Sequence, residues 1–298
     1  MLPSPPITDH KKGLAIAALG GVLIACDIPL VRLAGSDPWT VMLVRGPLMF
    51  AVLYAVYRLL KALKLSNARF IDGWDTVILA ILHMIATVGF VLGIYYTTTA
   101  NLVFITAFSS LVAIVFTTFV LRERHPLMTW LTVFVALVGI LIITIDDLVV
   151  NSGANTFGNL MALLCAVMLA AETVFIRRSG KNLVYSPALA GLLAALVAVP
   201  FVMIGGFTLQ EPAFLVLNSV FVAPLAMAMF ALAPRYISAP EVAMFYLLET
   251  VLAPLMVWSL FDETLSTNTL IGGAIVIGAI LVHSLLRLRS RPAAVAFT

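Results

Sequence analysis

The chain has 298 residues, of which 62% are hydrophobic and only 10% are charged, and its mean hydropathy is +1.13. A soluble domain carries about 25% charged residues, so this composition argues against a water-soluble enzyme or binding module. The net charge of +3, without basic residues interleaved with aromatics, does not suggest a nucleic-acid partner. We therefore expect an integral membrane protein in contact with the lipid bilayer.

Ten apolar segments are long enough to cross the roughly 30 Å hydrocarbon layer as helices. Their approximate limits are 13–33, 38–60, 74–96, 100–121, 127–145, 156–178, 186–206, 213–233, 239–260 and 268–287. Backbone groups inside lipid must bond to one another, and the alternation typical of a membrane barrel strand is absent, so the expected class is all-α. The first apolar run is followed by Asp27 and not by the small residues of a signal-peptide cleavage site. We therefore expect this run to be a retained transmembrane span.

The distribution of basic residues predicts the orientation of these spans. With the N-terminus placed inside, 15 of the 17 Lys and Arg residues fall on the inner side. The exceptions are Arg32 on the outer side and Arg45 within the second span. Because inner loops are enriched in Lys and Arg, we expect both termini to be cytoplasmic.

Two stretches of the sequence match each other without gaps. GLAIAALGGVLIACDIPLVRLAG (13–35) opens the first span, and GNLMALLCAVMLAAETVFIRRSG (158–180) opens the sixth. In this register Asp27 falls on Glu172. Since an odd number of spans separates the two starts, the copies cross the membrane in opposite directions. This inverted repeat is typical of transporters whose site lies between the repeats near the midplane.

Three further stretches carry a resemblance to a known family. Pro38–Phe50 (PWTVMLVRGPLMF) holds an arginine inside the second span. Phe108–Pro126 and Leu248–Ser266 close the fourth and ninth spans with Glu123 and Glu263. With the repeat, these stretches resemble the drug/metabolite transporter superfamily in its EamA-type branch.

The resemblance implies ten transmembrane helices as two inverted five-helix repeats, 1–150 and 151–298, forming one membrane-embedded unit. It also implies secondary transport of a small-molecule substrate without a cofactor. Characterised bacterial members include exporters of aromatic amino acids, methionine and threonine. The expected function is therefore amino-acid export across the bacterial inner membrane by alternating access. Overall likeness favours the aromatic amino acid exporter group. Export of drugs or other metabolites is the alternative, and an intramembrane enzyme or a channel is a more distant one.

Three ionisable residues are candidates for gating or structural charges. Asp27 and Arg45 lie at matched depths on neighbouring spans, so we expect them to form an ion pair. Glu172 lies near the inner end of the sixth span. It is either a charge that snorkels to the inner interface or a gating residue.

A central cavity between the two halves is expected to bind the substrate, in contact with spans one, three, four, six, eight and nine. The candidate binding residues lie on the third and ninth spans. Glu249, about 15 Å into its span, is the deepest carboxylate and can hold a substrate ammonium or exchange a proton. His83 lies at similar depth, and Thr87 and Phe90 continue its helix face; Tyr246 lies one turn before Glu249. Packing is the alternative role for each of them, and for His83 a hydrogen bond to a backbone carbonyl.

The sequence contains no motif of an intramembrane enzyme. HExxH, GxSxG and paired aspartates at helical spacing do not occur in the spans, and no metal-ligand spacing involves Cys26 or Cys165. We expect no enzyme activity, no cofactor and no metal site. Protons are candidate coupling ions, and a monomer is the expected state because no dedicated dimer motif occurs.

Overall fold

The computed structural model describes residues 7–64, 69–97, 102, 105–122, 126–150, 156–261 and 267–290. The described elements of the first half are α1 (Ile7–Ile24), α2 (Asp27–Leu33), α3 (Pro38–Ala62), α4 (Trp74–Tyr96), α6 (Ser109–Val120) and α7 (Leu127–Val150). Those of the second half are α8 (Thr156–Ser179), α9 (Ser186–Gly205), α10 (Pro212–Leu217), η1 (Asn218–Val222), α11 (Ala223–Leu232), η2 (Ala233–Arg235), α12 (Ala239–Phe261) and α13 (Thr267–Ser290). All regular structure in these ranges is helical, so the all-α expectation is confirmed for them.

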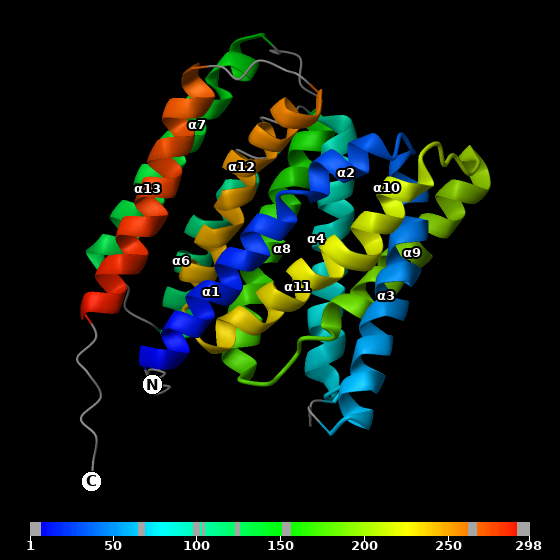
Figure 1. Cartoon of the computed structure of the whole chain (residues 1–298), viewed down its shortest axis with the longest axis horizontal. Helices are drawn as coiled ribbons and strands as arrows, with labels where there is room; N and C mark the ends of the chain where they lie inside the picture. Colours follow the sequence, from blue (N-terminus) through cyan, green and yellow to red (C-terminus); the bar gives the residue numbers. More distant parts are fainter. Residues whose placement is uncertain are drawn as a thin grey trace.

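Helices that are distant in sequence pack against each other in pairs. Helices α3 and α9 form one edge of the bundle and α7 and α13 form the opposite edge (Figure 1). Between the two edges, α4 packs along α8, and α1 packs along α11 and α12. Each half of the chain therefore completes its packing with helices of the other half.

The length and hydropathy of the described helices identify six segments that can cross a membrane. They are His10–Leu33, Pro38–Ala62, Trp74–Tyr96, Thr156–Ser179, Ser186–Gly205 and Pro212–Arg235. Shorter apolar helices are found at Ile105–Val120, Leu127–Ile142, Met244–Ala253 and Leu270–His283, where the other four spans were expected. The chain is thus a multi-pass membrane protein, while the number of ten spans stays a prediction. Glu123 and Glu263 lie outside the described residues.

The first expected span, 13–33, is not one continuous helix. Helix α1 ends at Ile24, and α2 begins at Asp27 after a turn at Ala25 and Cys26. Pro29 explains the break because it has no N–H to donate to the carbonyl one turn earlier, whereas a proline is tolerated in a first helical turn. The break also leaves Asp27 at the positive end of a short helix, where a carboxylate is favoured.

Helix α3 begins with a well-formed cap at Asp37. The Oδ1 atom accepts hydrogen bonds from the backbone N–H groups of Trp39 (2.9 Å) and Thr40 (3.1 Å), and Pro38 occupies the first helical position. The Oδ2 atom accepts from the Thr208 hydroxyl at 2.6 Å and from the Thr40 hydroxyl. Partial burial raises the pKa of the Asp37 carboxyl, but these hydrogen bonds outweigh burial and leave the pKa below its ordinary value of 3.8.

Glycines allow the backbones of α3 and α9 to touch. A Cβ atom built on Gly46 would collide with the carbonyl oxygen of Gly191 and lie 2.9 Å from the Cβ of Ala195. Small residues at such crossings are typical of membrane helices, which gain their association energy from close packing. This crossing fixes the wall of the bundle on which Arg45 lies.

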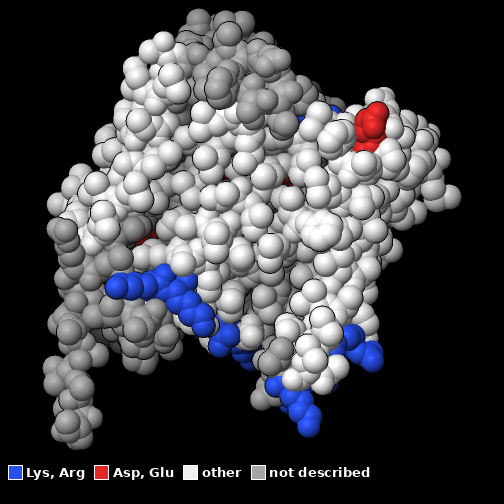
Figure 2. Space-filling model, in the orientation of Figure 1, with Lys and Arg blue, Asp and Glu red and all other residues white. Residues whose placement is uncertain are grey.

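The surface of the bundle is apolar between two polar ends. Large side chains such as Phe119, Phe134 and Ile204 are mostly exposed, which suits contact with lipid rather than water. In the face that Figure 2 shows, most Lys and Arg side chains gather where α1 begins and α3 ends, and the acidic side chain lies at the opposite end. We call these the basic end and the far end.

Candidate functional site

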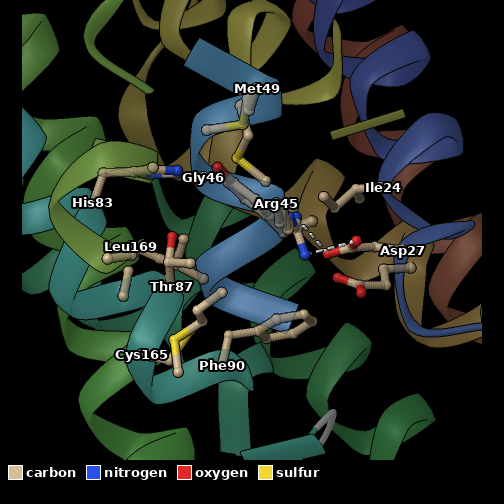
Figure 3. Close-up of a pocket in the computed structure, with 17 residues that line it drawn as sticks. Ile24, Asp27, Arg45, Gly46, Met49, His83, Thr87, Phe90, Cys165 and Leu169 are labelled. Carbon is tan, nitrogen blue, oxygen red and sulfur yellow. Dashed lines mark hydrogen bonds and ion pairs between the residues drawn. The ribbon is translucent and has the colours of Figure 1, made fainter. Parts of the chain in front are cut away.

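A central cavity lies among α1, α2, α3, α4, α8, α9, α11 and α12. All the predicted site residues except Glu172 line this cavity, namely Asp27, Arg45, His83, Thr87, Phe90, Tyr246 and Glu249. Figure 3 shows His83, Thr87, Phe90 and Cys165 around it, with Arg45 directed toward Asp27. The structure thus brings together residues from both halves of the chain.

The predicted pair of Asp27 and Arg45 is present. Arg45 Nη2 donates to Asp27 Oδ2 at 3.0 Å, and Arg45 Nη1 lies 3.0 Å from Asp27 Oδ1. Both side chains are buried, and Asn218 Nδ2 adds a hydrogen bond of 2.5 Å to Asp27 Oδ1. Asn218 begins η1, a π-helical turn, which is a distortion frequent at functional sites. Three spans therefore meet at the Asp27 carboxylate.

Glu172 pairs with His83 on the basic side of the cavity. His83 Nδ1 lies 2.8 Å from Glu172 Oε2, and both side chains are buried. The snorkelling interpretation of Glu172 is therefore wrong, because its carboxylate turns into the bundle toward α4 and not to the interface. For His83, the alternative role was a hydrogen bond to a backbone carbonyl, and in the structure its Nδ1 instead contacts the Glu172 carboxylate.

The carboxylate of Glu249 lies where the central cavity meets a side pocket. The side pocket is lined by Phe90, Leu169, Tyr246 and Leu247, together with Thr106 and Ala107, which precede α6. Glu249 Oε1 is buried and has no hydrogen-bond partner among the described residues. A buried acceptor without a partner is costly, so this oxygen is suited to receive a donor from a ligand.

Two adjacent aromatic residues of α12 have different surroundings. Tyr246 lines the cavity and stacks on Phe230, with ring centroids 3.8 Å apart and an interplanar angle of 12°. Phe245 packs in a core cluster with Leu14 and Ile24 of α1. Thr87 and Phe90 are half-buried on the cavity wall, as their shared helix face suggested.

Sequence reasoning missed several residues of the cavity. Met42 and Met49 of α3, Gly191 of α9 and Cys165 of α8 also line it, as does Met227 of α11. The second and seventh spans had not been expected to contact substrate. Asn218, buried within an apolar segment, carried a signal that could have been found, because an unpaired amide there would be costly.

The described residues contain no group of three or more His, Cys, Asp or Glu side chains that could hold a metal ion. The two cysteines are free thiols, Cys26 half-buried and Cys165 buried. The chemistry available in the cavity is therefore charge pairing, hydrogen bonding and apolar contact, which is the chemistry of binding a small solute.

Comparison with known proteins gives the family. No curated protein matches the chain. A crystal structure, described only as that of a protein, superimposes with a TM-score of 0.78 at 15% identity and covers 93% of this chain and 98% of the other. That likeness extends to the fold alone. The sequence pattern of the EamA-like transporter family matches residues 11–145 and 156–285, and the chain therefore belongs to this family of the drug/metabolite transporter superfamily.

Proposed function

We propose that the chain crosses the membrane ten times as two inverted five-helix repeats, 1–150 and 151–298, with the basic end in the cytoplasm of a bacterial cell. The packing supports this arrangement. The third span of each half packs along the first span of the other, α4 along α8 and α11 along α1. The pairs α3 with α9 and α7 with α13 join corresponding spans of the two halves. Such exchange is what a two-fold axis in the membrane plane produces.

The proposed activity is export of amino acids with apolar side chains across the inner membrane by alternating access. The single observation that carries it is the Glu249 carboxylate, whose buried oxygen lacks a partner among the described residues within an otherwise mostly apolar cavity.

The arrangement of charges suits a zwitterion. The substrate ammonium pairs with Glu249, and the substrate carboxylate approaches Arg45, which presents a cation to the same cavity. The apolar side chain enters the side pocket, whose walls include Phe90, Leu169 and Leu247. Asp27 neutralises part of the Arg45 charge, so the carboxylate is held loosely enough to leave again.

A second candidate is export of amphipathic cations. Met42, Met49 and Met227 line the cavity, and flexible thioether side chains adapt to ligands of different shape. A cation without a carboxylate needs Glu249 but not Arg45. The two candidates therefore separate by whether removal of the α-carboxylate from a substrate abolishes or preserves its transport.

The test is transport into liposomes that contain the purified protein. Labelled phenylalanine, methionine and threonine are compared with their decarboxylated amines and with cationic dyes. We expect saturable uptake of at least one amino acid. Glu249→Gln should raise its half-saturation concentration about tenfold or more in both directions of flux, because a charge-assisted hydrogen bond is lost.

Glu211→Gln is the matched control, since Glu211 is an exposed carboxylate at the far end before α10. It should transport as the unmodified protein does. If Glu249→Gln keeps the original affinity, rate and pH dependence, Glu249 is a packing residue and the proposed site is wrong. If amines and dyes move but amino acids do not, the second candidate replaces the first.

A further inference from the structure

Two carboxylates related by the internal repeat have related partners. The gap-free register of the sequence aligns Asp27 with Glu172. Asp27 is bound by Asn218, at the start of η1 in the third span of the second half. Glu172 is bound by His83, from α4, the third span of the first half. The same contact is thus made twice, once in each half of the chain.

The two contacts lie toward opposite ends of the central cavity. Asp27 begins α2 and pairs with Arg45, seven residues from the far end of α3. Glu172 lies seven residues before α8 ends at the basic end. Because an inverted repeat exchanges the two sides of the membrane, equivalent contacts are expected on opposite sides of the substrate site.

The contact of His83 with Glu172 separates the central cavity from a second pocket. Glu172 lines this second pocket, which we call the inner pocket, together with Thr173 and Ser186. His83, Met227 and Tyr246 line both spaces, so these side chains form the partition between them. The stack of Tyr246 on Phe230 belongs to the same partition, since both rings line the inner pocket.

The two repeat-related carboxylates also differ in the basic side chain that pairs with each, Arg45 with Asp27 and His83 with Glu172. An arginine guanidinium keeps its charge at every physiological pH, whereas a histidine imidazole exists in a protonated and a neutral form. The other titratable or charged groups on the cavity wall with His83 are Arg45 of α3, Asp27 of α2, Cys165 of α8, and Tyr246 and Glu249 of α12. On the inner pocket, Glu172 of α8 and Tyr246 of α12 are the titratable groups beside it.

We propose that His83 and Glu172 form a proton-binding site, and that the bound proton holds the basic end of the central cavity closed. With the proton on the imidazole, the bond to the carboxylate is charge-assisted and about twice as strong as a neutral one. Loss of the proton weakens the bond between α4 and α8, and the partition opens toward the inner pocket. The Asp27–Arg45 contact cannot respond in this way. The assignment of the basic end to the cytoplasm rests on the proposed function.

Cys165 provides a reporter because it lines the central cavity and is buried. In protein carrying Cys26→Ala, Cys165 is the single thiol of the chain. A membrane-impermeant maleimide is supplied from the basic end at about pH 6 and about pH 8, the range in which histidine titrates. A separate Lys11→Cys protein identifies the vesicles that present the basic end. Each labelling rate is divided by that of the protein unfolded in detergent at the same pH, which removes the intrinsic pH dependence of the thiol.

We expect the corrected rate to rise about tenfold from the lower to the higher pH, as a difference of about 1.4 kcal/mol between the two bonds gives. His83→Arg, which copies the permanent cation of the far end, should be protected at both pH values. His83→Gln and Glu172→Gln should be labelled rapidly at both. Equal corrected rates for the unmodified pair at the two pH values, or an unchanged pH dependence in His83→Gln, would overturn the proposal.

A second measurement is made on the unmodified protein, and a variant is needed only to assign one signal. The ring signals of the four histidines are followed by NMR in detergent, with His83 identified by its loss in one variant. A His83 ring that keeps one protonation state from about pH 5 to about pH 9 overturns the proposal.

The outcomes separate this proposal from the proposed function. Labelling and NMR need no transported substrate, so absence of amino-acid flux refutes only the proposed function. Amino-acid flux with pH-independent labelling refutes only the proton site.

Discussion

The buried pair of Asp27 and Arg45 makes a quantitative prediction. Replacing Arg45 by Gln leaves the Asp27 carboxylate with 1% exposure and, among the described residues, only the Asn218 amide as a side-chain donor. Replacing Asp27 by Asn leaves the guanidinium, which is 7% exposed, without its counterion. In both single variants an uncompensated charge remains inside the bundle.

The geometry sets the size of the effect. At the observed separation of 3.0 Å, two unit charges attract by about 5 kcal/mol with an effective dielectric constant near 20. Removing one partner of a buried pair typically costs about 3–5 kcal/mol, because the other charge stays desolvated. We expect each single variant to lose about 3–5 kcal/mol of unfolding free energy. The double variant Asp27→Asn with Arg45→Gln should recover at least about 2 kcal/mol of the summed loss.

The assay is reversible unfolding of the purified protein in mixed micelles, with the four proteins of the double-mutant cycle measured side by side. The coupling energy of the cycle is the quantity of interest. A double variant whose loss equals the sum of the two single losses would mean that the side chains do not interact, despite their distance. The argument from burial and charge would then be refuted.

Three further predictions concern packing, hydrogen bonding and pH. Gly46→Ala should destabilise the fold by about 1–3 kcal/mol, because the added Cβ meets the backbone of α9. Gly278→Ala is the control and should leave the stability unchanged, since no atom lies within 4 Å of its added carbon. Equal melting temperatures of the two variants would contradict this prediction. Asn218→Leu should cost about 1–3 kcal/mol in the same unfolding assay, since Asp27 Oδ1 loses an amide donor at 2.5 Å, and an unchanged stability would exclude a role for that bond. The depressed pKa of Asp37 stabilises the fold above the unfolded pKa of about 3.9, and this contribution is lost as the pH falls through the folded pKa. Thermal unfolding of Asp37→Asn should therefore differ from that of the unmodified protein at neutral pH and converge with it on acidification.

Much of the fold could be predicted because lipid restricts the possible structures. Apolar runs of the right length mark helices, since no other arrangement of a single segment satisfies its backbone in hydrocarbon. The helices α3 (Pro38–Ala62), α4 (Trp74–Tyr96) and α8 (Thr156–Ser179) match the expected limits closely. The break before Asp27 was not predicted. The number of apolar residues in a segment does not show where a proline interrupts the backbone hydrogen bonds of the helix.

The candidate site could be predicted where an ionisable residue occurs in an apolar segment, because such a residue needs a partner or a function. Asp27, Arg45 and Glu249 stand out in apolar segments, and each lines the cavity. The methionines that line the cavity could not be predicted. Met42 or Met227 in an apolar helix gives the same sequence pattern whether the side chain faces lipid, the core or the cavity. Three buried polar residues, His10, Glu241 and His283, come together from α1, α12 and α13, with Glu241 Oε1 at 3.6 Å and 4.0 Å from the two imidazoles. No spacing of these residues in the sequence predicts that the three side chains lie close together.

The sequence by itself determined that this protein is a helical membrane protein with two related halves, because composition, span length and the repeat of Asp27 on Glu172 depend only on the order of residues. Only the tertiary structure decided the partner of each charge. Glu172 lies close to Arg177 and Arg178 in sequence, yet it pairs with His83, 89 residues away. The reason is physical: helix rotation and interhelical contact fix where a side chain points, and in this bundle those contacts are made between the halves.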